Sequence, residues 1–195
     1  MKDKLTKWPR VSHTGRQQKK EMQYLAMHDQ LTGLYNRHFV AEQVQIGITE
    51  AQRHQTDYSM ILLDIDHFKQ VNDQHGHDIG DQVLKSVGEF LQEHARGDDV
   101  VARMGGEEFL ILLNHCDLNS AVEKAEMLRM GIETLKPADL LVTSSFGVSQ
   151  LNDEFNSFDK LFKAADLAVY NSKNSGRNCV TSSEGMHHQQ KSLQH

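Results

Sequence analysis

Apolar residues follow two alternating patterns along the chain. A helical spacing, with apolar side chains on one face, covers residues 36–54, 80–95, 117–135 and 158–173. Short continuous apolar runs, as in buried strands, cover residues 58–66, 99–104, 109–113 and 140–149. This order predicts an α/β (α+β) domain in which helices cover both faces of a mixed sheet.

The two ends of the chain are more polar than its middle. Residues 1–28 predict a linker with a short helix, residues 29–181 the domain, and residues 182–195 a disordered tail. No apolar run approaches the roughly 20 residues of a membrane span, and the basic start lacks the apolar core of a signal peptide. We therefore expect a cytoplasmic protein with no membrane segment in this chain.

The charge balance bears on possible partners. The net charge is −6 over 195 residues, whereas nucleic-acid binders rely on clustered Lys and Arg. We therefore expect no nucleic-acid partner. An acidic protein that handles phosphates would need metal ions to offset the repulsion.

Two glycines and two glutamates interrupt the apolar pattern of RMGGEEFLILL, residues 103–113. Because glycine tolerates positive φ, Gly105 and Gly106 permit a tight hairpin turn that presents Glu107 and Glu108. Taken alone, a GGEE segment would most often be a solvated hairpin tip. A second acidic cluster favours a site instead.

That cluster is ILLDIDHF, residues 61–68, where Asp64 and Asp66 end a buried strand. Residues two apart on a strand point to the same face. Two unpaired buried carboxylates would be costly, so a cation partner is expected. If this strand neighbours the hairpin, the carboxylates converge on a site suited to Mg²⁺ or Mn²⁺ and to phosphate chemistry.

Polar groups that could recognise a nucleotide lie between the two acidic clusters. Asn72 and Asp81 could together read a base edge, since a carboxylate can accept from the two adjacent N–H groups of guanine. His67, His75 and His77 could instead indicate a zinc or iron site, although their spacing matches no common metal motif. Ordinary loop histidines are the alternative.

Four motifs occur in one order: HDQLTGLYNRHF (28–39), DIDHFKQVNDQHGHDIGDQVL (64–84), RMGGEEF (103–109) and YNSKNSGRN (170–178). Together they resemble the GGDEF domain, the catalytic domain of diguanylate cyclases. The resemblance implies a mainly antiparallel sheet similar to those of nucleotidyl cyclases and polymerase palm domains. It also implies condensation of two GTP into cyclic di-GMP with release of two pyrophosphates.

The resemblance assigns roles to particular residues. Glu107 is implied as the base for the GTP 3′-hydroxyl, and Asp66 is expected to be structural. The implied ligands of two Mg²⁺ or Mn²⁺ ions per GTP are Asp64, the Ile65 carbonyl, Glu107 and Glu108. The implied substrate-binding residues are Lys69, Asn72, His77, Asp81, Gly105, Gly106, Lys173 and Arg177. Lys173 and Arg177 could also be helix-end cations, and Asn36 and Arg37 are expected to cap a helix.

An RxxD pair, Arg96 and Asp99, precedes the two glycines by five residues. In the family this offset marks an inhibitory site that binds the product. A simple surface ion pair is the alternative interpretation.

The implied reaction sets requirements on partners. One domain holds one GTP, so the active enzyme is expected to be a two-fold homodimer with its site at the interface. We also expect a sensory or receiver domain outside this chain. The alternatives are a module that binds GTP or cyclic di-GMP without turnover, an enzyme that makes a mixed cyclic dinucleotide, and a metal-dependent phosphate hydrolase.

Overall fold

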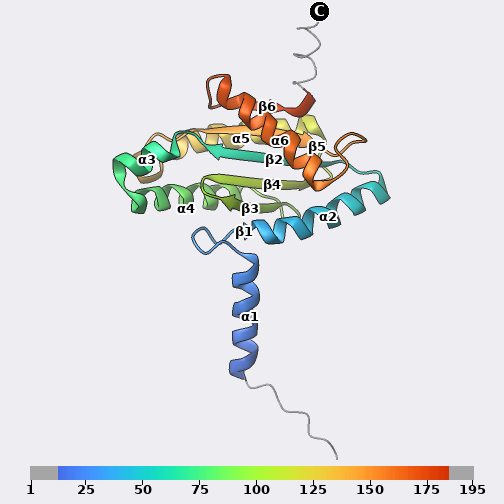
Figure 1. Ribbon diagram of the computed structural model, residues 1–195, viewed down its shortest axis with the longest axis horizontal. Helices are drawn as coiled ribbons and strands as arrows, with labels where there is room; N and C mark the ends of the chain where they lie inside the picture. Colours follow the sequence, from blue (N-terminus) through green and yellow to red (C-terminus); the bar gives the residue numbers. More distant parts are fainter. Residues whose placement is uncertain (1–12, 185–195) are drawn as a thin grey trace, which may run out of the picture.

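A six-stranded sheet forms the middle layer of the computed structural model, which describes residues 13–184 (Figure 1). Its strands are β1 (Tyr35–Asn36), β2 (Tyr58–Ile65), β3 (Val100–Gly105), β4 (Glu108–Asn114), β5 (Ser144–Gln150) and β6 (Val180–Ser182). Their order is β1-β3-β4-β2-β5-β6; the two outermost pairs are parallel and the three inner pairs antiparallel. The predicted fold class, a mixed and mainly antiparallel sheet, is confirmed.

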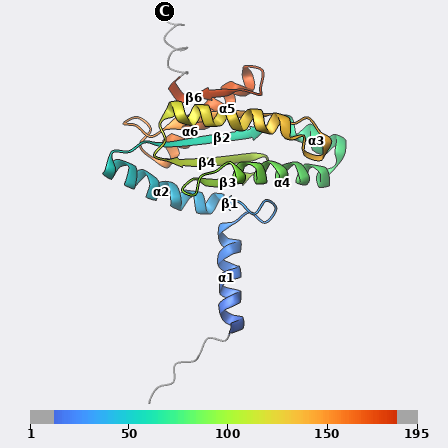
Figure 2. The same ribbon diagram turned by 180° about the vertical axis from the view of Figure 1, so that it is seen from behind.

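Helices cover both faces of this sheet, with α4 and α5 on one face and α2 and α6 on the other (Figures 1 and 2). The helices are α1 (His13–Met27), α2 (Arg37–His54), α3 (Phe68–His75), α4 (His77–Glu93), α5 (Leu118–Leu135) and α6 (Phe158–Asn174), with a 3₁₀ turn at Pro137–Asp139. Within residues 13–184, no helix is both long and apolar enough to cross a membrane.

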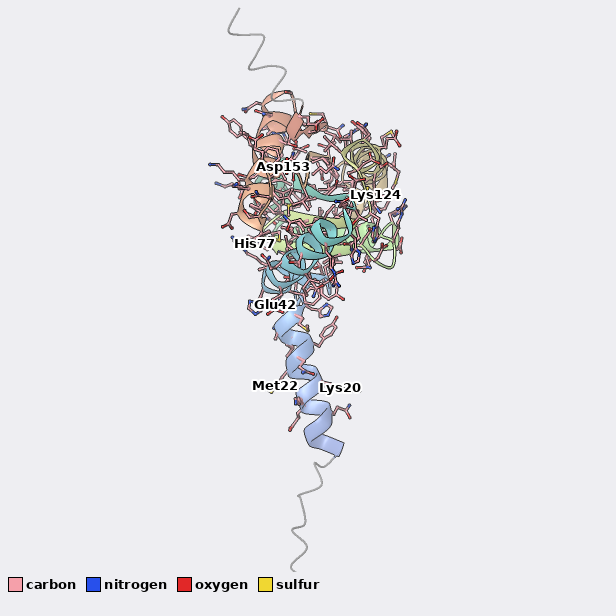
Figure 3. The ribbon with its side chains drawn as sticks, turned by 90° about the vertical axis from the view of Figure 1, so that its right-hand side faces the viewer. Lys20, Met22, Glu42, His77, Lys124 and Asp153 are labelled. Atoms are coloured by element: carbon pink, nitrogen blue, oxygen red, sulfur yellow. The ribbon has the colours of Figure 1, made fainter. Side chains whose placement is uncertain are left out.

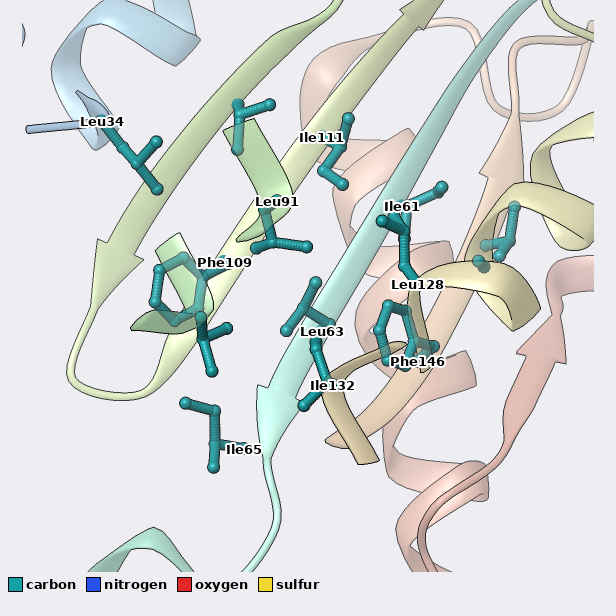
Figure 4. Close-up of a cluster of buried hydrophobic side chains, with 14 of the residues drawn as sticks. Leu34, Ile61, Leu63, Ile65, Leu91, Phe109, Ile111, Leu128, Ile132 and Phe146 are labelled. Atoms are coloured by element: carbon teal, nitrogen blue, oxygen red, sulfur yellow. The ribbon is translucent and has the colours of Figure 1, made fainter. Parts of the chain in front are cut away.

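The strand β2 is buried along its whole length and separates two hydrophobic cores. Ile61, Leu63 and Ile65 belong to the core under α4 and α5, part of which is drawn in Figure 4. Met60 and Leu62 belong to the core under α2 and α6. Because side chains alternate along a strand, Asp64 falls on the second face, at the end of the strand.

The helices predicted from periodicity lie close to the predicted ranges. Asn36 caps α2, since its Oδ1 accepts from the Phe39 N–H at 3.0 Å, and Asp117 caps α5 in the same way. Three features differ from the prediction. Residues 68–75 form α3, where no helix had been predicted, the strand expected from residue 140 starts at Ser144, and β1 and β6 had not been predicted.

The two ends of the described chain differ in how they contact the domain. The helix α1 projects from it, so that Lys20 and Met22 lie away from the sheet and its covering helices (Figure 3). At the other end, residues 182–184 do not form the expected tail, because β6 runs to Ser182 and Ser183 is buried. The rest of that expected tail, residues 185–195, lies outside the described residues. The same holds for residues 1–12 of the expected linker, whereas α1 is the short helix predicted within it.

Candidate active site

Sheet pairing brings the two acidic clusters together. β2 and β4 are antiparallel neighbours, and Asp64 is the direct partner of Glu108 in their register. The Ile65 N–H donates to the Glu107 carbonyl oxygen at 3.2 Å, so the hairpin turn is attached to the end of β2. The turn and Ile65 lie at the same end of the sheet (Figure 4). The condition on which the sequence analysis made the carboxylates converge, that this strand neighbours the hairpin, is therefore met.

The turn between β3 and β4 depends on its two glycines. Gly105 has φ 138° and Gly106 has φ 53°, values that side-chain-bearing residues rarely adopt. Both glycines are exposed, whereas Glu107 and Glu108 are half-buried. The turn therefore directs the two carboxylates toward the protein rather than into open solvent, unlike a solvated hairpin tip.

The acids at this end of the sheet perturb one another's ionisation. Burial raises the pKa of Asp64, Lys173 opposes that rise, and Glu107 adds to it. Burial and the nearby charges of Asp64 and Asp166 raise the pKa of Glu108. Crowded, partly desolvated carboxylates that repel one another favour a bound cation. A cation binds the ionised forms of these carboxylates. As the pH is lowered, the cation affinity should therefore begin to fall at a higher pH than it would for ordinary exposed carboxylates.

Lys173, in the last turn of α6, places a positive charge beside the acids at the end of β2. Its Nζ lies 2.7 Å from Asp64 Oδ2, with side chains 34% and 12% exposed. Lys173 is thus more than a cation at a helix end, because it forms a direct ion pair with the acid at the end of β2.

Asp66 has a different environment from Asp64. Its carboxylate accepts from Thr143 Oγ1 at 2.8 Å, from Ser145 Oγ at 2.6 Å and from the Asn178 N–H at 3.1 Å. These bonds attach the segment after α6 to the sheet. Such a saturated carboxylate has few lone pairs left for a metal, which agrees with the structural role expected for Asp66.

A cavity of about 250 Å³ opens at the end of β2. It brings together six of the predicted site residues: Asp64, Ile65, Lys69, Glu107, Lys173 and Arg177. They come from β2, the start of α3, the hairpin turn, the end of α6 and the segment after α6. Acidic and basic groups therefore share one opening, as the binding of a metal-bound polyphosphate requires.

The residues predicted to read a base lie outside this cavity, on α3 and α4. Asn72 is half-buried, and its Oδ1 lies against Gly80, where any side chain would collide with it. Asp81 follows Gly80 directly and is exposed, as is His77. The close contact between α3 and α4 thus places Asn72 against Gly80, the residue before Asp81.

The side chains proposed as metal ligands do not converge on one point in this structure. Within residues 13–184, no group of three or more His, Cys, Asp or Glu side chains is arranged to hold a metal ion. The hard oxygen donors near the Ile65 carbonyl fit Mg²⁺ or Mn²⁺ by type, and Lys173 would have to release Asp64 for them to act as ligands. The same part of the chain gives no support to the zinc or iron alternative at the three histidines.

The RxxD pair lies away from this site, in the loop before β3. Asp99 Oδ2 accepts from the Arg96 backbone N–H at 2.8 Å and pairs with Lys124 Nζ at 2.6 Å. The Asp99 side chain is 2% exposed, whereas Arg96 is exposed. The ion pair of Asp99 is therefore with Lys124, a residue of α5 that sequence reasoning missed.

Residues 26–179 match the family model described as "Diguanylate cyclase, GGDEF domain". The chain belongs to the GGDEF family. The four motifs identified from sequence all fall within the matched residues. The acids, glycines and lysine described above also lie inside the match. The family assignment made from those motifs is thus confirmed.

Several proteins are similar to this GGDEF domain. It is 38% identical over 161 residues to diguanylate cyclase DgcM of Escherichia coli (strain K12), covering 82% of this chain and 39% of that protein. It is 40% identical over 162 residues to response regulator PleD of Caulobacter vibrioides, covering 80% and 36%. The chain therefore spans well under half the length of these two relatives.

Solved structures agree with the fold. The GGDEF domain of DgcB from Caulobacter crescentus, in complex with c-di-GMP, has a TM-score of 0.76 at 32% identity, covering 82% of this chain and 94% of that one. The active GGEEF domain of a diguanylate cyclase from Vibrio cholerae has a TM-score of 0.72 at 30% identity, covering 75% and 96%. Our chain thus corresponds to nearly the whole of these isolated domains.

Proposed function

We propose that the chain is a diguanylate cyclase, which condenses two GTP into cyclic di-GMP and two pyrophosphates. The observation that carries this proposal is the cavity at the end of β2, where Asp64 and Glu107 meet Lys69, Lys173 and Arg177. Family membership and the DgcB complex with c-di-GMP support it.

Each of these residues has a separate role in the proposed reaction. Glu107 takes the proton of a GTP 3′-hydroxyl, whose oxygen then attacks the α-phosphorus of the second GTP and expels pyrophosphate. The same step on the other nucleotide closes the ring, so two phosphodiester bonds replace two phosphoanhydride bonds. Lys69, Lys173 and Arg177 offset charge on the phosphates, and the exposed Gly105–Gly106 backbone leaves room for the α-phosphate.

Two Mg²⁺ or Mn²⁺ ions per GTP complete this proposal. Asp64, the Ile65 carbonyl, Glu107 and Glu108 would hold them, and the ions would polarise the phosphate oxygens. Lys173 would then pair with a phosphate instead of Asp64, which would leave the Asp64 carboxylate free to hold a metal ion.

The reaction requires two copies of the domain, because each copy presents one 3′-hydroxyl to the nucleotide of the other. We therefore propose an active two-fold homodimer. The projecting α1 exposes Met22 at 71% and Leu25 at 48%, apolar side chains three residues apart on a helix that could pair with a second copy. In the longer proteins of the family, a sensory or receiver domain would precede this helix and control the pairing.

Product analysis tests the proposal. Purified chain at high concentration, incubated with GTP and Mg²⁺, is expected to yield cyclic di-GMP and pyrophosphate. A chain with Asp64→Asn should yield neither, because the charged ligand at the end of β2 is lost. Pyrophosphate without any cyclic dinucleotide would indicate a phosphate hydrolase instead.

Guanine recognition is expected to depend on Asp81. An Asp81→Ser chain should lose the acceptor for two guanine N–H groups, so the preference for GTP over ATP in kcat/KM should fall by about 100-fold. Competition between the two nucleotides measures this ratio. Asp78→Ser, at a neighbouring exposed acid of the same helix, is the matched control. An unaltered GTP preference in Asp81→Ser would show that Asp81 does not bind the base. It would favour the alternative of an enzyme that makes a mixed cyclic dinucleotide.

We also propose that Arg96 and Asp99 form a site that binds cyclic di-GMP and inhibits the enzyme, in which the exposed Arg96 contacts the product and the buried Asp99 holds the loop. An Arg96→Ala chain should need at least about 10-fold more product for half-inhibition, because a charge-assisted contact to the product is lost. Initial rates with added cyclic di-GMP measure this shift. Arg53→Ala, at an exposed Arg of α2, is the control. Inhibition that is unchanged in Arg96→Ala would exclude the site.

A further inference from the structure

The guanidinium of Arg103 joins two segments that are far apart in sequence. Its Nη1 lies 3.1 Å from Asp29 Oδ1 and 3.3 Å from Asp29 Oδ2. Its Nε and Nη2 donate to the Gly106 carbonyl oxygen at 3.0 and 2.8 Å. One side chain thus bonds both the segment after α1 and the turn that carries Glu107, and it is only 13% exposed.

Beyond the pairing of β3 with β4, few other contacts hold that turn. A Cβ added at Gly105 or Gly106 would meet nothing within 4 Å, so no packed side chains surround the backbone there. The bond from the Ile65 N–H to the Glu107 carbonyl secures one side of the turn, and Arg103 secures the other. Since glycine backbones are permissive, the position of the Gly106 carbonyl depends on these bonds.

Asp29, in turn, is firmly placed. Its Oδ1 accepts from Thr32 N–H at 2.9 Å and from Thr32 Oγ1 at 2.7 Å. Burial opposes ionisation of Asp29, but the bonds from Thr32 and Arg103 outweigh it and hold the pKa below its usual value. The carboxylate is therefore charged at neutral pH and is fixed relative to the loop after α1.

A column of stacked rings attaches α1 to this same loop. The ring centroids of Tyr24 and His28 are 4.0 Å apart, those of His28 and Tyr35 are 4.7 Å apart, and those of Tyr35 and Phe39 are 3.9 Å apart. Tyr24 belongs to α1, and His28 directly precedes Asp29. A displacement of α1 therefore acts on the residue next to the Arg103 partner.

We propose that Arg103 is a positioning residue that transmits the placement of α1, through Asp29, to the Gly106 carbonyl and so to Glu107. This route lies within one chain and is separate from the pairing of two copies through α1. It rests on the proposed function only in treating Glu107 as catalytic. The connection itself can be tested without nucleotide or turnover.

Hydrogen exchange at the Ile65 amide reports the turn, because this amide donates to Glu107. We expect Asp29→Asn and Arg103→Lys each to accelerate this exchange about 5-fold in the full chain, as for the loss of one hydrogen bond. Asn keeps an oxygen for Thr32, and Lys keeps the charge but not the forked geometry. Arg53→Lys, at an exposed Arg of α2, is the control and should leave Ile65 exchange unchanged. Wild-type exchange in both test variants would overturn the positioning role.

A second variant tests the connection to α1. Tyr24→Ala removes the first ring of the column without touching Arg103. It should accelerate Ile65 exchange in the wild-type chain, at the same fixed chain concentration, but add nothing in the Arg103→Lys chain. No acceleration in the wild type, or the same factor in both backgrounds, would overturn the proposed route. Because no cyclase activity is measured, failure here is distinct from failure of the proposed function.

Discussion

Replacing Glu107 by Gln is expected to lower the rate of cyclic di-GMP formation by about 1,000-fold or more. The amide is nearly isosteric but can neither take the 3′-hydroxyl proton nor offer a charged oxygen to a metal, and loss of a positioned base alone costs about 100- to 10,000-fold. The measurement is the initial rate with saturating GTP and Mg²⁺, at a chain concentration that supports dimers.

Glu123→Gln, at an exposed Glu on α5, controls for the loss of one negative charge and should retain the wild-type rate. The midpoint temperature of thermal unfolding of Glu107→Gln should stay close to that of the wild type. The crowded acids repel one another, and removal of one charge relieves part of that repulsion. A Glu107→Gln chain that keeps more than a tenth of the wild-type rate would show that another group is the base.

Gly147→Ala is expected to cause the largest loss of stability. Gly147 lies in β5 where α6 crosses the sheet, and an added Cβ would collide with the Ala165 carbonyl and lie 2.6 Å from the Val169 nitrogen. Both are backbone atoms, so α6 as a whole must shift, and Lys173 shifts with it. We expect a loss of about 3 kcal/mol in the free energy of unfolding, measured by urea denaturation.

Gly97→Ala is the matched control, because a Cβ at Gly97 meets nothing within 4 Å. Its stability should stay within about 0.5 kcal/mol of wild type. If Gly147→Ala is as stable as Gly97→Ala, then the close approach of α6 to β5 does not limit this position.

The placement of each acidic cluster at the end of its own element could be predicted from sequence because it depends on local rules. Alternation along a buried strand placed Asp64 on a defined face, and the glycine pair fixed the hairpin whose first paired residue is Glu108. The fold class followed from the alternation of helical and strand patterns. These features need only the residue order and the periods of helix and strand.

Long-range polar pairs could not be found in this way. Arg103 and Asp29 are 74 residues apart, and Lys124 is 25 residues from Asp99. Nothing in a single sequence says which of many charged residues will meet. The same limit applies to α3, an eight-residue helix in which Phe68 alone is buried, and to β1, whose two residues are specified by pairing with β3.

The rate of cyclic di-GMP formation per chain, measured with GTP and Mg²⁺ over a range of chain concentrations, tests the central claim most directly. We predict that this rate rises with concentration and then levels off, with two pyrophosphates released per cyclic di-GMP. A coiled coil fused before α1 should make the rate independent of concentration. A fused chain that binds GTP yet forms no cyclic di-GMP would contradict the proposed cyclase and indicate a module that binds nucleotide without turnover.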